Sequence, residues 1–140
     1  MTNVCDFRLR VRYAETDQMQ VAYYANHFVW FEVGRAELCR NCGFSYQEME
    51  RRTGCFLMVA AASCRYRQPL LYDMEFVVRT RLQQLTRRTA CFRYELRDIS
   101  GDTVYAEGET RHVVVNNQGN PTSFPEPYRQ QLFSALQPDG

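Results

Sequence analysis

The sequence contains no lysine, so all 17 of its basic residues are arginines. This absence excludes mechanisms that depend on a lysine Schiff base or a lysine nucleophile, and it leaves arginine as the binder of phosphate groups. The motifs G-x-S-x-G, G-x-x-x-x-G-K-[ST] and G-x-G-x-x-G are also missing. Serine hydrolases of the nucleophile-elbow type and the common nucleotide-binding loops are therefore not indicated.

A long apolar run is missing as well. The first residues, MTNVCDFRLRVR, carry charges where a signal peptide or membrane span would be apolar, so we expect a cytoplasmic protein. The 17 basic and 16 acidic residues leave a net charge of +1, which predicts neither a nucleic-acid partner nor attraction to a membrane. A length of 140 residues with 45% hydrophobic content suits one domain over residues 1–140.

The cysteines should remain reduced, because no export signal is present. Cys39 and Cys42 form a C-x-x-C, which could serve redox chemistry or supply half a metal site. No second pair and no nearby histidine completes a tetrahedral set of ligands. We therefore expect structural thiols, no metal and no cofactor. The six cysteines are Cys5, Cys39, Cys42, Cys55, Cys64 and Cys91.

Periodicity predicts a strand followed by a long helix. Apolar residues alternate with three arginines from Phe7 to Tyr13, which is typical of a strand with one apolar face. Apolar residues then recur at helical spacing from Phe28 to Cys42, with Asn26 as the expected N-cap and Gly43 as the stop.

A second short helix is expected over residues 45–52, where Ser45 is the cap and Glu48 completes a capping box. Four strand-like runs follow at residues 56–67, 74–85, 89–97 and 103–115, and a short helix entered through prolines is expected over residues 124–136. The order of elements predicts an α+β domain in which one long helix lies on one face of an antiparallel sheet.

The segment FLMVAAASC, residues 56–64, does not alternate, so both of its faces should be buried. A single sheet with one long helix can cover only one face of this segment. The sequence therefore predicts a partner subunit on the other face.

The string RYAETDQMQVAYYANHFVWFEVGR, residues 12–35, resembles the hot-dog-fold acyl-CoA thioesterases of the 4-hydroxybenzoyl-CoA thioesterase type. The E-T-D turn, the Y-x-A-N that follows it and the F-E-x-x-R of the helix carry the resemblance. It continues at Arg88–Thr89, Thr110–Val114 and Phe124–Pro125, and so covers most of the chain. The fold it implies is a five-stranded antiparallel sheet wrapped around one central helix.

The resemblance implies that Asp17 is the catalytic carboxylate, acting as nucleophile or general base. Asp17 would lie near the start of the central helix of the neighbouring subunit, so that each active site is at a dimer interface. The backbone N–H of Tyr24 would donate to the thioester carbonyl oxygen, because a helix N-terminus favours developing negative charge. Asn26 would act mainly as the N-cap and secondarily in shaping the site.

The chain departs from the family at two positions. The family usually has glycine where this chain has Gln20, so the loop after Asp17 could turn differently, because glycine tolerates backbone angles that glutamine does not. Many members have histidine where this chain has Tyr24, whereas the 4-hydroxybenzoyl-CoA branch has tyrosine.

Arg87, Arg88 and Thr89 are candidates for binding the CoA phosphates, which is what their position in the family implies. A solvated hairpin turn is the alternative for these residues. For Glu32 we weigh orientation of a catalytic group, a pair with Arg35 and solvent exposure.

The remaining candidates are histidines and aromatic residues. We interpret His27 as a packing or surface residue and His112 as structural. Five aromatic side chains should belong to the core or an interface, and some could line an acyl pocket: Tyr23, Tyr24, Phe28, Trp30 and Phe31.

These observations favour a thioesterase that releases a free acid and CoA from an acyl-CoA. The alternatives are a thioesterase acting on acyl carrier protein and a non-catalytic acyl-thioester binding protein. A hot-dog dehydratase is disfavoured, because neither histidine falls on a suitable motif. We expect a homodimer, and pairing of dimers into a homotetramer from the family.

Overall fold

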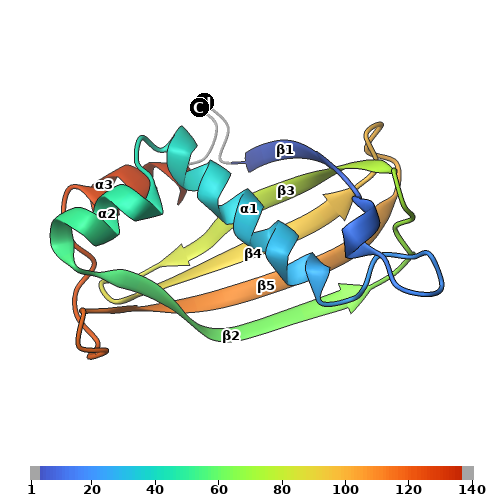
Figure 1. Ribbon diagram of the computed structural model, residues 1–140. Helices are drawn as coiled ribbons and strands as arrows, with labels where there is room; N and C mark the ends of the chain where they lie inside the picture. Colours follow the sequence, from blue (N-terminus) through green and yellow to red (C-terminus); the bar gives the residue numbers. More distant parts are fainter. Residues whose placement is uncertain (1–3, 137–140) are drawn as a thin grey trace.

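The computed structural model describes residues 4–136, which form one five-stranded antiparallel sheet with its longest helix on one face (Figure 1). The strand order is β1-β3-β4-β5-β2. The strands are β1 (Val4–Arg10), β2 (Phe56–Tyr66), β3 (Glu75–Leu85), β4 (Thr89–Arg97) and β5 (Val104–Val115). The helices are α1 (Asn26–Asn41), α2 (Tyr46–Thr53) and α3 (Tyr128–Phe133), with 3-10 turns at Tyr13–Glu15 and Ser134–Leu136.

The later strands match their expected ranges to within one residue, which confirms the α+β architecture. The first strand was expected to reach Tyr13 but ends at Arg10. The chain turns there because the Arg12 backbone N–H donates to Glu15 Oε1 at 2.7 Å, which closes the 3-10 turn. The expected final helix over 124–136 is shorter than predicted and begins only at Tyr128.

The expected N-cap of α1 is wrong by one residue. Ala25 holds the N-cap position without a side-chain bond, and Asn26 is the first helical residue. The Asn26 side chain instead donates to the carbonyl oxygen of Glu15 at 2.8 Å. For α2 the expected cap is confirmed, since Ser45 Oγ accepts from the Glu48 N–H at 3.1 Å.

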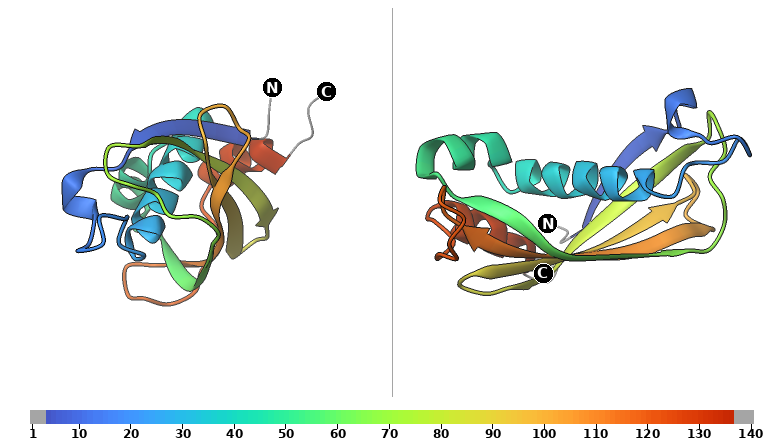
Figure 2. Two further views of the ribbon diagram at one scale, coloured as in Figure 1. Left: turned by 90° about the vertical axis from the view of Figure 1, so that its right-hand side faces the viewer. Right: turned by 60° about the horizontal axis from the view of Figure 1, so that its bottom comes forward.

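Helix α1 packs closely across the concave face of the curved sheet (Figure 2). The Phe31 ring stacks on Tyr94 with centroids 4.5 Å apart. Two glycines allow this approach: a Cβ on Gly34 would lie 2.3 Å from Thr80 Oγ1, and one on Gly108 would lie 2.2 Å from the Phe31 ring. Neither position could hold a side chain without moving the helix away from the sheet.

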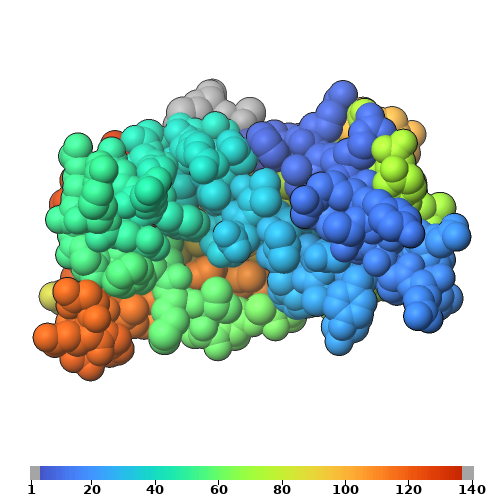
Figure 3. Space-filling view, in the orientation of Figure 1, coloured from blue at the N-terminus to red at the C-terminus, as the bar shows by residue number. Residues whose placement is uncertain are grey.

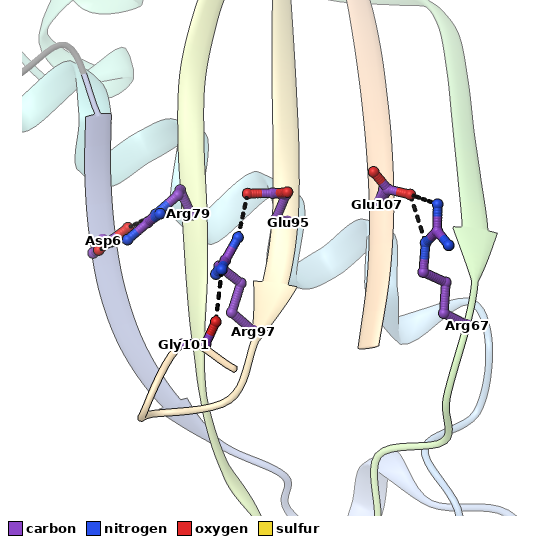
Figure 4. Close-up of polar contacts among 7 residues, drawn as sticks. All are labelled: Asp6, Arg67, Arg79, Glu95, Arg97, Gly101 and Glu107. Atoms are coloured by element: carbon purple, nitrogen blue, oxygen red, sulfur yellow. Dashed lines mark hydrogen bonds and ion pairs between the residues drawn. The ribbon is translucent and has the colours of Figure 1, made fainter. Parts of the chain in front are cut away.

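The outer face of the sheet is charged. Arg8 and Arg10 point away from α1, as their alternation with apolar residues predicts, and their side chains are more than half exposed. Ion pairs cross between neighbouring strands or lie along one strand (Figure 4). The pairs drawn there are Asp6–Arg79, Glu95–Arg97 and Glu107–Arg67. The side chains of these pairs are partly exposed to solvent, so each pair contributes at most about 1 kcal/mol.

Strand β2 is an edge strand that pairs with β5 alone within residues 4–136. The expected burial of both its faces is not met within one chain: Met58 and Val59 are 49% and 50% exposed. Atoms of β5 are visible between α1 and β2, because the helix does not reach over this edge (Figure 3). An exposed apolar edge strand presents unpaired backbone groups together with apolar surface.

No helix within residues 4–136 is long and apolar enough to cross a membrane.

Candidate active site

The loop between Thr16 and Ala22 presents Asp17 beside the start of α1. The Asp17 N–H donates to the Val21 carbonyl and the Gln20 N–H donates to the Asp17 carbonyl, each at 2.9 Å. Gln20 has a φ of 65°, the left-handed conformation that glycine adopts without strain. The loop therefore keeps a glycine-like turn in spite of the departure at this position, at a cost of about 1–2 kcal/mol.

One of the two oxygens of the Asp17 carboxylate accepts a hydrogen bond within residues 4–136. Its Oδ1 accepts from the Met19 N–H at 2.8 Å, which is the turn-forming role of an aspartate. Its Oδ2 has no hydrogen bond to any of residues 4–136, and the residue is exposed. One carboxylate oxygen thus holds the loop while the other remains open to a ligand.

Asp17 lines a cavity of about 370 Å³. Its wall combines polar side chains with aromatic and aliphatic ones. Residues lining it include Asp17, Val21, Tyr24, His27, Tyr66 and Leu70. These residues come from one chain, so Asp17 and Tyr24 share a cavity at the start of their own helix. The expected contribution of the neighbouring subunit's helix stays a prediction.

The two peptide groups next to Tyr24 are held in place by hydrogen bonds to their carbonyl oxygens. The Tyr23 carbonyl accepts from the Asn26 N–H at 2.9 Å, and the Tyr24 carbonyl accepts from the His27 N–H at 3.3 Å and the Tyr66 hydroxyl at 2.9 Å. In a trans peptide the N–H points opposite to the carbonyl. The Tyr24 N–H is therefore turned away from the body of α1, and it has no partner among the described residues.

Glu15 organises this region, and sequence reasoning did not identify it. It is buried, its Oε2 accepts from Trp30 Nε1 at 3.1 Å, and its carbonyl accepts from the Tyr23 N–H and from the Asn26 side chain, each at 2.8 Å. The residue stood in the E-T-D motif, but no local pattern indicated that its carboxylate would be buried. Asn26 therefore acts by tying the helix start to Glu15, and it is not among the residues that line the cavity.

Two further residues of the cavity wall were not expected. His27 is 4% exposed, and its ring meets the Tyr66 ring edge-on with centroids 4.6 Å apart. Partial burial beside Cys64 raises the pKa of Tyr66 to about 12, so its hydroxyl stays protonated and can donate to Tyr24. Tyr66 ends β2, and only the folded chain brings it to the helix start.

The candidate phosphate-binding residues belong to the turn between β3 and β4, which lies at the opposite end of the sheet from the loop that precedes α1 (Figure 1). Arg87 and Arg88 form the exposed turn between β3 and β4, where Arg87 Nε donates to Ser123 Oγ at 2.9 Å, and Thr89 begins β4. Thr89 pairs with Val113 near the start of β2, whereas the cavity lies at its end. One chain therefore does not bring these residues to the cavity.

Two other candidates, Glu32 and His112, are not among the residues that line the cavity. Glu32 is exposed, and Arg35 bonds to the Tyr94 hydroxyl at 3.1 Å instead of to Glu32. His112 is buried and its Nε2 lies 2.9 Å from Thr110 Oγ1, which agrees with a structural role.

The cysteines are free thiols in the described part of the chain. Burial raises the pKa of Cys39 to about 12, so this thiol of the C-x-x-C is not activated for redox chemistry. Within residues 4–136, no three His, Cys, Asp or Glu side chains are grouped so that they could hold a metal ion.

Comparison with known proteins assigns the fold and the family. The chain matches the thioesterase-like superfamily over residues 11–132. It is 34% identical over 110 residues to the "Putative acyl-CoA thioesterase YneP" of Bacillus subtilis (strain 168), which covers 79% of this chain and 78% of that protein.

Solved structures agree with this assignment. A hypothetical protein from Thermus thermophilus superimposes with a TM-score of 0.88 at 32% identity, covering 94% of this chain and 98% of that one. The DHNA-CoA thioesterase from Staphylococcus aureus gives a TM-score of 0.88 at 26% identity, covering 95% of this chain and 90% of that one. The architecture is thus the hot-dog fold, and the chain belongs to the thioesterase-like superfamily and is a thioester hydrolase.

Proposed function

We propose that the protein hydrolyses acyl-CoA thioesters with Asp17 as the reactive carboxylate and the Tyr24 N–H as the oxyanion donor. The observation that carries this proposal is that both residues line one cavity, where Asp17 has a free carboxylate oxygen and Tyr24 an unpartnered N–H among residues 4–136. The relation to YneP supports CoA as the carrier of the acyl group. The 4-hydroxybenzoyl-CoA branch suggested by Tyr24 stays a prediction.

The chemistry needs few groups, because a thioester carbonyl is electrophilic and a thiolate leaves readily. Asp17 either attacks the carbonyl carbon to form a mixed anhydride, which water then opens, or removes a proton from the attacking water. In both routes the carbon–sulfur bond breaks, the thiolate of CoA takes up a proton, and the acid keeps an oxygen from water. The N–H of Tyr24 and the positive end of α1 stabilise the oxyanion.

The complete site requires a second copy of the chain. Antiparallel pairing of β2 with β2 of another copy would satisfy the free edge and cover the exposed Met58 and Val59. In such a pair the Tyr66 end of one β2 lies beside the Phe56 end of the other. The register of β5 then brings the second copy's Arg87–Arg88 turn towards the cavity, where guanidinium groups suit the phosphates of CoA. A further pairing of dimers into a tetramer stays a prediction.

The test is hydrolysis of a panel of acyl-CoAs by wild type and Asp17→Asn, followed by thioester absorbance because the six thiols would react with a thiol reagent. We expect Asp17→Asn to fold and to lose about 10²- to 10⁴-fold in kcat. Asp73→Asn makes the same chemical change at an exposed aspartate outside the cavity, so it serves as the matched control and should keep the wild-type rate.

Two outcomes would contradict the proposal. Full activity of Asp17→Asn would remove this residue from the chemistry. Binding of acyl-CoA without turnover by wild type would favour the non-catalytic binding protein, and turnover of carrier-bound acyl groups alone would favour the acyl-carrier-protein thioesterase.

A further inference from the structure

Glu15 is a buried carboxylate in the turn that leads to Asp17. Its Oε1 accepts from the Arg12 backbone N–H at 2.7 Å, and its Oε2 accepts from Trp30 Nε1 at 3.1 Å and lies 3.3 Å from the Arg12 guanidinium. Glu15 is 6% exposed and is not among the residues that line the cavity. A buried carboxylate destabilises a fold unless its partners compensate it. The presence of Glu15 therefore calls for a role that an apolar side chain would not fill.

Trp30 anchors this carboxylate to the body of the fold. The indole is buried, and its ring packs against the Phe76 ring of β3 with centroids 4.8 Å apart. Trp30 belongs to α1, so its Nε1–H joins the Tyr13–Glu15 turn to a helix that is itself packed on the sheet. The hydrogen bond from Trp30 therefore holds the turn in a defined position relative to α1.

The main chain of Glu15 binds the segment on both sides of Tyr24. Its carbonyl oxygen accepts from the Tyr23 N–H and from the Asn26 side chain, each at 2.8 Å. These two hydrogen bonds flank the Tyr24 N–H, the proposed oxyanion donor. Asp17 follows Glu15 by two residues. Glu15 thus binds the segment that contains the proposed donor and directly precedes the segment that contains the proposed reactive carboxylate.

We infer that Glu15 is a positioning residue for the thioesterase reaction: its buried carboxylate, bound to Trp30, sets the placement of Asp17 relative to the Tyr24 N–H. The inference rests on the proposed function and adds a residue to it. Asp17 must act at the carbon of the thioester carbonyl, directly or through a water, while the Tyr24 N–H must reach its oxygen. A shift of one group relative to the other therefore slows the chemical step. Substrate binding should change less, because Glu15 does not line the cavity.

The experiment compares steady-state kinetics of wild type, Glu15→Gln, Trp30→Phe and the double variant on an acyl-CoA that wild type hydrolyses. Glu15→Gln keeps the size of the side chain, but an amide accepts hydrogen bonds at one atom only and so leaves one of the two N–H donors unpaired. We expect each single variant to lower kcat about 10- to 100-fold, with KM within about threefold of wild type. The double variant should lose less than the product of the two single losses, because both changes remove the same contact.

Glu37→Gln is the matched control. Glu37 also pairs with an arginine three residues away, Arg40, and it lies towards the other end of α1, outside the cavity. The control removes a carboxylate of the same kind, so kcat should stay at the wild-type value. Urea unfolding of every variant identifies conditions under which each is folded, and the kinetics are measured there.

Amide hydrogen exchange separates positioning from overall stability. In Glu15→Gln the exchange rate of the Tyr23 amide should rise by a larger factor than the rates of the core amides of β3 and β4. A purely structural role would raise all of these rates together and would leave the kcat of the folded enzyme unchanged. If Glu15→Gln does not fold, Trp30→Phe is compared with wild type by the same measurements.

Three results would overturn the inference alone. They are a wild-type kcat in the folded single variants, single losses that multiply in the double variant, and a rise in Tyr23 exchange no larger than that of the core amides. Absence of turnover of every acyl-CoA by wild type would overturn the proposed function, and the inference with it.

Discussion

At the scale of single residues, the site depends on side chains that fix backbone groups. The Tyr24 N–H is free among the described residues because its neighbouring carbonyls are engaged, and Tyr66 supplies one of those bonds from the end of β2. Glu15 does the same for the Tyr23 N–H through its own carbonyl. An oxyanion donor is effective only when it is held in place before the substrate arrives.

Tyr66→Phe should therefore slow the chemical step. Removing the hydroxyl leaves the Tyr24 carbonyl with the longer bond from His27, so the adjacent peptides can shift. We expect kcat to fall about tenfold with a smaller change in KM, since a misplaced catalytic group costs rate more than binding. Steady-state kinetics on one acyl-CoA measure this, with Tyr13→Phe, an exposed tyrosine outside the cavity, as the control. An unchanged kcat would show that the hydroxyl does not position the donor.

Because His112 is buried, we expect the protein to lose stability at mildly acidic pH. Burial, followed by the charge of Arg35, lowers its pKa from 6.5 to about 4, so the unfolded chain binds a proton that the folded chain excludes. Its contribution to stability is full above pH 6.5, falls between pH 6.5 and 4, and changes no further below pH 4. At pH 5 the loss is about 2 kcal/mol, and the lowered pKa of His27 acts in the same direction.

Urea unfolding at pH 7.5 and pH 5, at one protein concentration, measures this loss of stability on acidification. His112→Gln should lose less stability between these two pH values than wild type, whatever its stability at the higher pH. Equal losses in the two proteins would mean that His112 does not resist protonation.

At the scale of elements, the contact between α1 and the sheet sets where the start of the helix lies. Gly34 lets the helix backbone approach Thr80 and Val78 on β3, and Gly108 leaves room for Phe31. The same helix contains His27, and its first residue, Asn26, follows the segment that contains Asp17. A helix displaced from the sheet would also displace the Tyr24 N–H, the proposed oxyanion donor.

Gly34→Ala should destabilise the protein although alanine is the better helix former. The new methyl group would lie 2.3 Å from Thr80 Oγ1 and 2.9 Å from a Val78 methyl carbon. We expect a loss of about 1–3 kcal/mol from overpacking, against a gain of about 1 kcal/mol in helix propensity. Thermal and urea unfolding measure the net change in the free energy of unfolding. The control is Ala36→Gly, which lowers helix propensity on the same helix. If Gly34→Ala were more stable than wild type, the tight packing of α1 against the sheet would be contradicted.

At the scale of the whole molecule, one chain keeps the two parts of the proposed site apart, and the proposed dimer would join them. The cavity lies near the Tyr66 end of β2 and the Arg87–Arg88 turn lies near its Phe56 end. The edge strand between them exposes Met58 and Val59. Antiparallel association through β2 addresses both features together. The charged outer face, with its own ion pairs, offers no comparable apolar surface within residues 4–136.

Met58→Asp and Val59→Asp should each weaken the dimer, because a carboxylate would be buried at the shared edge without a partner. Sedimentation should show monomers, and the KM for acyl-CoA should rise as the second copy's arginines are withdrawn. Ile99→Asp, an exposed apolar position in the loop between β4 and β5, should remain dimeric and active. A wild-type protein that is a stable and active monomer would contradict the shared site.

The sequence by itself determined the elements and the candidate for the reactive carboxylate. Alternation and helical spacing depend on residues near one another in the chain, and they predicted β3, β4 and β5 to within one residue. The same holds for the Ser45 cap, whose partner is three residues away. Asp17 was identified from a motif, and its place in the cavity agrees with the role proposed for it.

Tertiary structure alone decided how the site is assembled. Glu15 meets Trp30 across 15 residues and Tyr66 meets Tyr24 across 42, so neither contact leaves a periodic signal in the sequence. Asn26 resembled an N-cap because that interpretation uses only its neighbours, whereas its bond goes back to Glu15. His27 joins the cavity wall only because the fold packs its ring against Trp30 and Tyr66. Long-range contacts place these groups, and local patterns do not encode them.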